Sequence, residues 1–175
     1  MQSVKIVITG PFNAGKTSFI KSVSEITVLS TERQVSGSSG EGDGETTVAM
    51  DFGRITVSDD VVLYLFGTPG QARFSFMWET LSEGMLGFVF LVDAQDSATF
   101  SDARGMIEFF TSMSDVPFVV AANRVVADDA ELLRRVREDL KLPEKVPLLA
   151  VDARSRASVK GVLLDLLYEI LKSME

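Results

Sequence analysis

Cysteine and histidine are both absent from the 175 residues of this chain. Without cysteine, disulfides and thiolate metal sites are excluded. Without histidine, the chain lacks the commonest general base and the commonest metal ligand of proteins. Any catalysis must therefore use carboxylates, lysine, glutamine, backbone groups or a bound metal ion.

The balance of charge is a second restriction. Lysine and arginine together number 17 and aspartate and glutamate 25, which gives the chain a net charge of −8 at pH 7. Such an acidic chain disfavours nucleic acid or an anionic membrane as its main partner. No apolar run reaches the roughly 18 residues of a membrane span, and neither end carries a signal-peptide or lipidation pattern. We therefore expect a cytoplasmic protein without a membrane anchor.

Hydrophobic residues make up 46% of the chain, enough to bury a full core, and its length fits one domain spanning residues 1–175. The predicted strands cover residues 4–9, 48–57, 61–66, 87–92, 117–122 and 147–151, and the predicted helices residues 15–23, 98–113, 130–140 and 158–172. This alternation predicts an α/β fold with a six-stranded, mostly parallel sheet and helices on both faces. A short turn joins the second and third strands into a hairpin, which adds one antiparallel edge strand.

One segment has almost no side chains able to pack. Residues 36–44 read Ser-Gly-Ser-Ser-Gly-Glu-Gly-Asp-Gly, with four glycines in nine residues. It is either a flexible surface loop or a loop that orders only when a ligand binds. Ordering a backbone costs about 1–2 kcal/mol per residue, so we expect this segment to be poorly ordered without nucleotide.

Residues 10–17 read Gly-Pro-Phe-Asn-Ala-Gly-Lys-Thr and match the phosphate-loop pattern G-x-x-x-x-G-K-[ST] between a predicted strand and a predicted helix. The two glycines let the backbone approach a phosphate closely, with successive N–H groups pointing at it. Lys16 would contact the β- and γ-phosphates, and the Thr17 hydroxyl would bind Mg²⁺. The predicted nucleotide-binding residues of this segment are Gly10, Asn13, Ala14, Gly15, Lys16, Thr17 and Ser18.

Further motifs resemble those of the Ras-like small GTPases, and among them the bacterial gliding-motility (MglA-type) and conservon-type branch. Residues 46–53, Thr-Thr-Val-Ala-Met-Asp-Phe-Gly, resemble the end of the first switch. Residues 65–74, Leu-Phe-Gly-Thr-Pro-Gly-Gln-Ala-Arg-Phe, resemble the second-switch motif D-T-x-G-Q-x-R-F. Asn123-Arg124 and Asp152-Ala153-Arg154 stand where the family has its two base-binding motifs. The resemblance implies a Ras-like fold and runs from residue 5 to about residue 171.

The resemblance also implies roles for residues of the two switches. The hydroxyl of Thr47, with Thr46 as the alternative, would complete the Mg²⁺ shell. The Gly70 backbone N–H would bind the γ-phosphate, and Gln71 would orient the attacking water. Lys16, Gly70 and Gln71 are therefore the predicted catalytic set, and Thr17 and Thr47 the predicted metal ligands.

On the base side, the resemblance implies that the Asn123 amide supports the purine ring and the phosphate loop. The Ala153 backbone N–H would meet guanine O6, with Arg124, Asp152 and Arg154 beside it in the site. The implied ligands are GTP or GDP with Mg²⁺. The implied activity is slow, regulator-dependent GTP hydrolysis in bacterial signalling, with a Roadblock-type regulator as partner.

Three positions depart from the family pattern. Gly67 replaces an Asp that holds Mg²⁺ through water, which should weaken Mg²⁺ binding. Val126 replaces the Asp that accepts two hydrogen bonds from guanine, unless Asp128 or Asp129 takes its place. Phe12 replaces a Gly and would crowd an arginine entering from a regulator, so an assisting arginine could instead be Arg54 or Arg73 of this chain.

Two functions from different classes are consistent with these features. The first is an active GTP-binding switch. The alternative is a degenerate GTPase fold that binds nucleotide weakly or not at all and acts as a scaffold. A P-loop kinase of a small metabolite would need an arginine-bearing lid, which the segments after the strands do not supply.

Overall fold

The computed structural model describes residues 1–36, 45–126 and 129–175, with residues 30–36 and 45–49 described as backbone alone. The strands are β1 (Gln2–Thr9), β2 (Leu29–Ser36), β3 (Glu45–Ser58), β4 (Val61–Gly67), β5 (Gly87–Asp93), β6 (Phe118–Asn123) and β7 (Leu148–Val151). The helices are α1 (Lys16–Val23), α2 (Ser75–Ser82), α3 (Phe100–Met113), α4 (Ala130–Asp139) and α5 (Arg156–Ser173), with short 3₁₀ turns η1 (Ala72–Phe74) and η2 (Ser97–Thr99).

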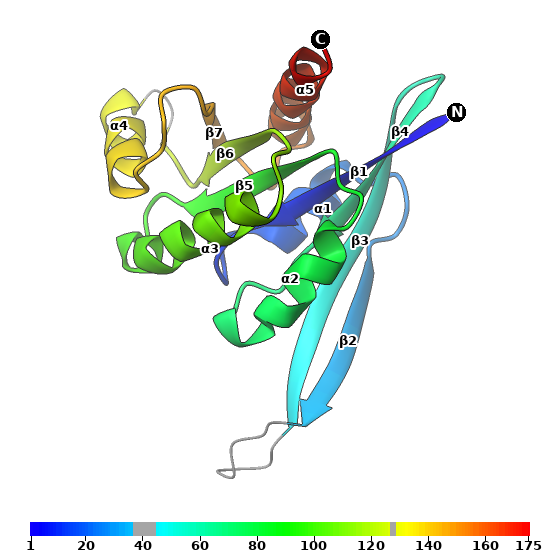
Figure 1. Ribbon diagram of the computed structural model, residues 1–175, viewed down its shortest axis with the longest axis horizontal. Helices are drawn as coiled ribbons and strands as arrows, with labels where there is room; N and C mark the ends of the chain where they lie inside the picture. The colour runs from blue at the N-terminus through cyan, green and yellow to red at the C-terminus, as the bar shows by residue number, and fades with distance from the viewer. Residues whose placement is uncertain (37–44, 127–128) are drawn as a thin grey trace.

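The strands form one sheet in the order β2-β3-β4-β1-β5-β6-β7, with helices packed against it (Figure 1). β4, β1, β5, β6 and β7 pair in parallel, whereas β3 is antiparallel to both of its neighbours. The predicted α/β fold with a mostly parallel sheet is therefore confirmed, and all of its predicted strands are present. None of the helices in the described part of the chain has the length and apolar character needed to cross a bilayer.

A seventh strand, β2, extends this sheet beyond the six predicted strands. It pairs with β3 from Leu29 opposite Phe52 to Ser36 opposite Glu45, so β3 is an inner strand and β2 the edge. Its sequence, LSTERQVS, lacks the apolar alternation that marks a half-buried strand. Backbone pairing with the long β3 forms this strand, which is why hydrophobic patterning did not reveal it. The predicted poor order of residues 36–44 concerns residues 37–44, which lie outside the described residues.

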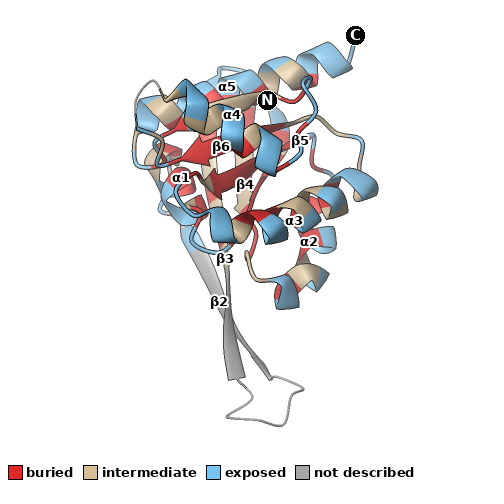
Figure 2. Ribbon diagram, turned by 90° about the vertical axis from the view of Figure 1, so that its left-hand side faces the viewer, coloured by how far each residue is buried: buried red, intermediate tan, exposed pale blue. Residues whose placement is uncertain are grey.

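Two hydrophobic cores lie on opposite faces of the sheet. One includes Ile6, Ile8, Phe19 and Leu166, which join the sheet to α1 and α5. The other joins the sheet to α2, α3 and α4 and includes Val7, Phe88, Phe90, Trp78 and Phe110. Figure 2 shows the buried residues concentrated on the strands and on the inward faces of the helices. Because parallel strands are covered on both faces, their side chains are apolar in both directions.

The turn after β1 depends on a close backbone contact. Gly10 has φ of 145°, and a Cβ atom there would lie 2.0 Å from the Leu91 carbonyl oxygen of β5. Only glycine meets both conditions without strain. This contact places the start of the phosphate loop against the carboxyl end of β5, where the loops after β4, β6 and β7 also gather.

Candidate nucleotide site

The phosphate loop connects β1 to α1 and lines a cavity of about 340 Å³. Gly15 and Asn13 have φ of 109° and 65°, which turns the loop back on itself before α1 begins at Lys16. The lining residues are Phe12, Asn13, Gly15, Lys16, Thr17, Ser18, Asp51, Thr68, Pro69, Gly70, Gln71, Phe74 and Arg124. The loop predicted to bind phosphate and the second-switch segment therefore form one cavity.

Lys16 is a buried cation of this cavity. Its side chain is only 8% exposed, and its Nζ donates to the carbonyl oxygens of Gly10 at 2.6 Å and Pro11 at 2.8 Å. Burial lowers the pKa of Lys16 to about 8, and the nearby Asp51 carboxylate offsets part of that shift. An ammonium group held on neutral carbonyls is prepared to accept an anion, because a phosphate would supply the negative charge that those acceptors lack.

Asp51 is a functional candidate that the sequence analysis missed. Its carboxylate is 7% exposed, and its Oδ2 accepts a hydrogen bond of 2.5 Å from the Thr17 hydroxyl. It lies on β3 directly opposite Gly67 on β4. A Cβ atom on Gly67 would lie 3.3 Å from the Asp51 Cβ and 3.5 Å from its Oδ2.

The Asp51 carboxylate therefore lies beside position 67, where the resemblance places an Asp, and next to the predicted metal ligand Thr17. The register of the predicted hairpin, which sets residue 51 opposite residue 67, was the signal that could have found it. Hydroxyl and carboxylate oxygens are the ligands that Mg²⁺ takes from proteins, usually only one or two of them with several retained waters.

The second-switch segment lies directly on the phosphate loop. A Cβ atom on Gly70 would lie 2.4 Å from the Phe12 nitrogen and 2.8 Å from the Lys16 Nζ. The Trp78 indole N–H donates to the Pro69 carbonyl oxygen at 2.7 Å and fixes the turn from the α2 side. Gly70 therefore occupies space above the loop that any larger residue would overfill.

Gln71 follows Gly70 and lines the same cavity. Its side-chain oxygen accepts a hydrogen bond of 2.6 Å from the Arg73 Nε. Arg73 is therefore adjacent to the predicted catalytic glutamine. Arg54 lies instead on β3 opposite Tyr64, outside the residues that line the cavity.

Asn123 joins three loops through its buried amide. Its Nδ2 donates to the Ala14 carbonyl oxygen of the phosphate loop at 3.0 Å. Its Oδ1 accepts from the backbone N–H groups of Arg124 at 3.0 Å and of Ala153 at 3.2 Å. The Ala153 N–H that was predicted to meet guanine O6 is engaged here by Asn123, so a base oxygen would have to share this donor.

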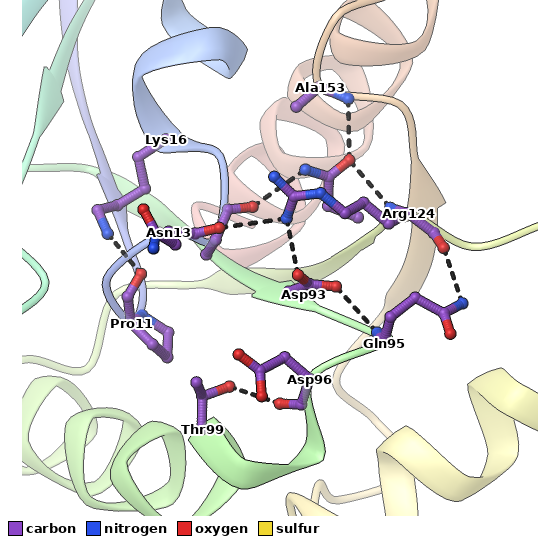
Figure 3. A network of polar contacts seen from close by, with 11 residues as sticks. Pro11, Asn13, Lys16, Asp93, Gln95, Asp96, Thr99, Arg124 and Ala153 are labelled. Atoms are coloured by element: carbon purple, nitrogen blue, oxygen red, sulfur yellow. Dashed lines mark hydrogen bonds and ion pairs between the residues drawn. The ribbon is translucent and has the colours of Figure 1, made fainter.

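Arg124 follows β6, and its side chain lies near Asn13 of the phosphate loop and Asp93 of β5 (Figure 3). It has φ of 64°, and its Nη1 donates to the Asn13 carbonyl oxygen at 3.2 Å and to the Asp93 Oδ2 at 2.9 Å. Gln95 contacts both members of the Arg124–Asp93 ion pair. Its backbone N–H donates to the Asp93 Oδ1 at 2.9 Å, and its side-chain amide donates to the Arg124 carbonyl oxygen at 3.0 Å. These contacts fix the arginine stem beside a second cavity.

That second cavity, of about 400 Å³, adjoins the first at Ser18 and Arg124. Its lining residues are Ser18, Asn123, Arg124, Val125, Val126, Val151, Asp152, Ala153 and Arg154. All the residues predicted for the base side therefore come together next to the phosphate cavity. The size and position of the cavity suit a purine ring whose phosphates lie on the loop.

The expected guanine-binding carboxylate is replaced in this cavity by Val126, whose side chain is 71% exposed. Asp128, one suggested substitute, lies outside the described residues. Asp129, the other, accepts from the Leu132 N–H at 3.0 Å and caps α4. The remaining carboxylate of the lining, Asp152, accepts from the Arg154 N–H at 3.0 Å.

Thr47 is the one predicted metal ligand that lies away from the cavity. Its backbone is part of β3 and pairs with Gln34 of β2, four residues before Asp51. Four strand residues span about 13 Å. A metal role for Thr47 therefore requires the β2–β3 pairing to open, and it stays a prediction because that side chain is not described.

The sequence itself matches a known protein family over most of its length. Residues 29–173 match the family described as "Conserved hypothetical ATP binding protein". The chain belongs to this family. The matched region begins after the phosphate loop, which its own motif and geometry identify.

Three individual proteins are similar to this chain at 25–27% identity. An uncharacterized protein of Methanocaldococcus jannaschii is 27% identical over 73% of this chain and 74% of its own length. ADP-ribosylation factor-like protein 8c of Arabidopsis thaliana is 25% identical over 74% of this chain and 65% of its own. The Ras-related protein SEC4 of Candida albicans is 25% identical over 69% of this chain and 60% of its own.

These findings support a nucleotide-binding P-loop protein related to Ras-like and ADP-ribosylation-factor-like proteins. The coarser part of the predicted resemblance is thereby confirmed. Membership of the gliding-motility and conservon-type branch stays a prediction. The name of the family refers to an adenine nucleotide, whereas the motifs of this chain predicted a guanine nucleotide. The preference for one base over the other must therefore be judged from the residues that line the second cavity.

The lowered pKa of Lys16 predicts a pH dependence of nucleotide binding. With a pKa of about 8 in the free protein, about nine tenths of the Lys16 groups are charged at pH 7 and about one tenth at pH 9. Phosphate binds the charged form, so the affinity for a nucleoside triphosphate should fall about tenfold between pH 7 and pH 9. Calorimetric titration across this range measures the effect. A Lys16→Arg variant, which stays charged, should show no such decline, and an equal decline in both proteins would contradict the assignment.

Proposed function

We propose that this protein is a GTP-binding molecular switch that hydrolyses GTP slowly and depends on a regulator to accelerate the reaction. The observation that carries the proposal is the contact of Gly70 with the phosphate loop, beside Lys16 and Phe12. A ligand whose terminal phosphate enters this space must displace Gly70. The position of the second-switch segment would then report which nucleotide is bound.

The residues of the phosphate cavity suit this activity. Lys16 would neutralise the β- and γ-phosphates once it leaves its contacts with the Gly10 and Pro11 carbonyls. The N-terminus of α1 and the backbone N–H groups of the loop would hold the remaining phosphate oxygens. Gln71 would orient the attacking water after releasing Arg73. Each of these groups reaches its role by exchanging a partner, which is consistent with slow unassisted hydrolysis.

Magnesium is the metal that this arrangement fits. The Thr17 hydroxyl would bind it directly, and Asp51 would hold one of its waters in place of the carboxylate missing at Gly67. When bound, the ion would offset the negative charge that develops on the phosphates. The Roadblock-type regulator implied by the resemblance belongs to the same proposal, as the partner that brings the switch segments into their active positions.

The base cavity supports a modest preference for guanine. The Ala153 N–H is a donor and suits the guanine O6 better than the adenine amino group, while Val126 offers no acceptor for the guanine N1–H and amino group. The same exposed Val126 favours the second candidate function, a scaffold that binds nucleotide weakly. Measured affinity and turnover distinguish the two candidates.

Hydrolysis tests the proposed activity directly. We expect the protein saturated with Mg-GTP to convert it to GDP in a single turnover, and Gln71→Leu to lower that rate constant by at least about tenfold with GTP affinity little changed. The matched control is Gln95→Leu, which removes an amide from the base side and should leave the single-turnover rate nearly intact. Tight GTP binding without turnover in the wild type would contradict the proposed GTPase activity. Absence of GTP binding would favour the scaffold function.

Base selectivity is tested at position 126. Val126→Asp should raise GDP affinity by about 10- to 150-fold, because a charged acceptor is worth ~1.5–3 kcal/mol, and should leave ADP affinity nearly unchanged. Val126→Asn, similar in size but uncharged, should give a smaller gain. Calorimetric titration with the magnesium salts of GDP and ADP measures both. A wild type that already prefers GDP many thousand-fold would show that another group accepts these hydrogen bonds.

The role of Asp51 is tested by magnesium dependence. Asp51→Asn keeps an oxygen beside the Thr17 hydroxyl but removes the charge, so the free Mg²⁺ needed for half-maximal tightening of GTP binding should rise about 10- to 100-fold. Asp93→Asn, at the base side beside Arg124, is the control and should leave this Mg²⁺ requirement unchanged. An unchanged requirement in Asp51→Asn would exclude Asp51 from the metal site.

A further inference from the structure

Helix α5 carries apolar side chains on two faces. Its inner face is buried in the core through Val159, Val162, Leu163, Leu166 and Ile170. Leu164, Tyr168 and Leu171 form a second line on its outer face, with exposed fractions of 60%, 63% and 63%. We call these three residues the α5 stripe. Their spacing of four and three residues is that of a helix seam that packs against another helix.

The stripe has a hollow at one end and projections at the other. A groove of about 190 Å³ lies between β3 and the N-terminal half of α5, lined by Ile55, Thr56, Val57, Lys160, Leu163, Leu164 and Leu167. The projections are Leu171 and Met174, whose side chains are 63% and 71% exposed at the C-terminal end of the same helix. The groove and the two projecting side chains belong to one apolar surface. Within the described part of the chain, no side chain fills the groove and no hollow receives Leu171 and Met174.

Opposite charges flank the stripe on one side. Asp165 and Lys172 are both exposed and lie seven residues apart, about 10.5 Å along the helix. That separation is too great for an ion pair within one helix. Lys172 reaches Glu169 at 3.5 Å, an exposed pair of small energetic value.

We propose that the α5 stripe is the contact surface of a homodimer, in which two copies of α5 pack antiparallel about a two-fold axis near Tyr168. This arrangement sets Leu164 of one copy against the partner's Leu171 and brings the partner's Met174 to the groove between β3 and α5. It also places Asp165 next to the partner's Lys172 twice, once on each side of the axis. A two-fold interface is self-complementary in this way.

A parallel pairing of the two helices fails on the same features. It would hold Leu171 and Met174 level with the same residues of the partner, about 10–15 Å along the helix from the partner's Leu164 and its groove. Asp165 would likewise stand about 10 Å from the level of the partner's Lys172. The distribution of shape and charge along α5 therefore specifies both the occupant, a second copy of this chain, and its direction.

The proposed dimer surface lies outside both nucleotide cavities and does not depend on the proposed function. One helix pair is a small interface, so we expect a concentration-dependent dimer with a dissociation constant of roughly micromolar or weaker. The two nucleotide sites of such a dimer would remain open.

Sedimentation of the full chain over a concentration series of roughly 5–500 µM tests the proposal. We expect a monomer–dimer equilibrium, and Leu164→Glu and Leu171→Glu should each raise the dissociation constant at least about tenfold, because each buries a charge at the seam. Phe76→Glu, which alters a 61% exposed aromatic side chain on α2, is the matched control and should leave the equilibrium unchanged. Thermal unfolding verifies that all three variants fold.

A charge exchange tests the direction of the pairing. Asp165→Lys and Lys172→Asp should each weaken the dimer, because each sets like charges together, whereas the double variant restores opposite charges and should return the dissociation constant to within about threefold of the wild type. Since residues 165 and 172 are too far apart to pair within one helix, direct compensation between their charges arises between copies. A strictly monomeric wild type, single variants without rescue in the double, or a monomer that uses the stripe to bind phospholipid vesicles would each overturn the proposal.

Discussion

The buried Asn123 amide holds the nucleotide end of the molecule together. Through three hydrogen bonds it ties the phosphate loop at Ala14 to the loop after β6 and to the loop after β7 at Ala153. Each bond is worth about 1 kcal/mol, but an orphaned buried partner costs about 1–3 kcal/mol, so the three loops are stable only as a set. The phosphate cavity and the base cavity share a wall because this amide joins the loops that form them.

The electrostatics of the phosphate cavity are arranged in advance of any ligand. Burial lowers the pKa of Lys16 to about 8, while its ammonium group donates to carbonyl oxygens, and Asp51 is buried against the Thr17 hydroxyl. A bound anion could replace the carbonyl partners of Lys16, and a hydrated cation could replace the hydroxyl partner of Asp51. The Asp51 carboxylate of β3 lies beside Gly67, where it could take the role proposed for the missing carboxylate.

The proposed switch would require two parts of the same site to move. Gly70 lies on the phosphate loop, and the backbone of residues 45–49 is held in the hairpin with β2 at the edge of the sheet. Strands at the edge of a sheet generally open at a lower free-energy cost than its inner strands. A ligand that displaces Gly70 and draws the start of β3 inward would exchange these weak contacts for stronger ones with phosphate and metal.

The sequence by itself determined the alternating α/β fold and the phosphate loop around Lys16, since local periodicity and a short motif encode both. It also named the residues that line the base cavity, because they follow predicted strands whose carboxyl ends meet at one edge. Only the tertiary structure decided that β2 extends the sheet, that Asp51 faces Gly67 and reaches Thr17, and that the Ala153 N–H bonds to Asn123. These features arise from pairing register and from contacts between residues far apart in the chain, which no local pattern records.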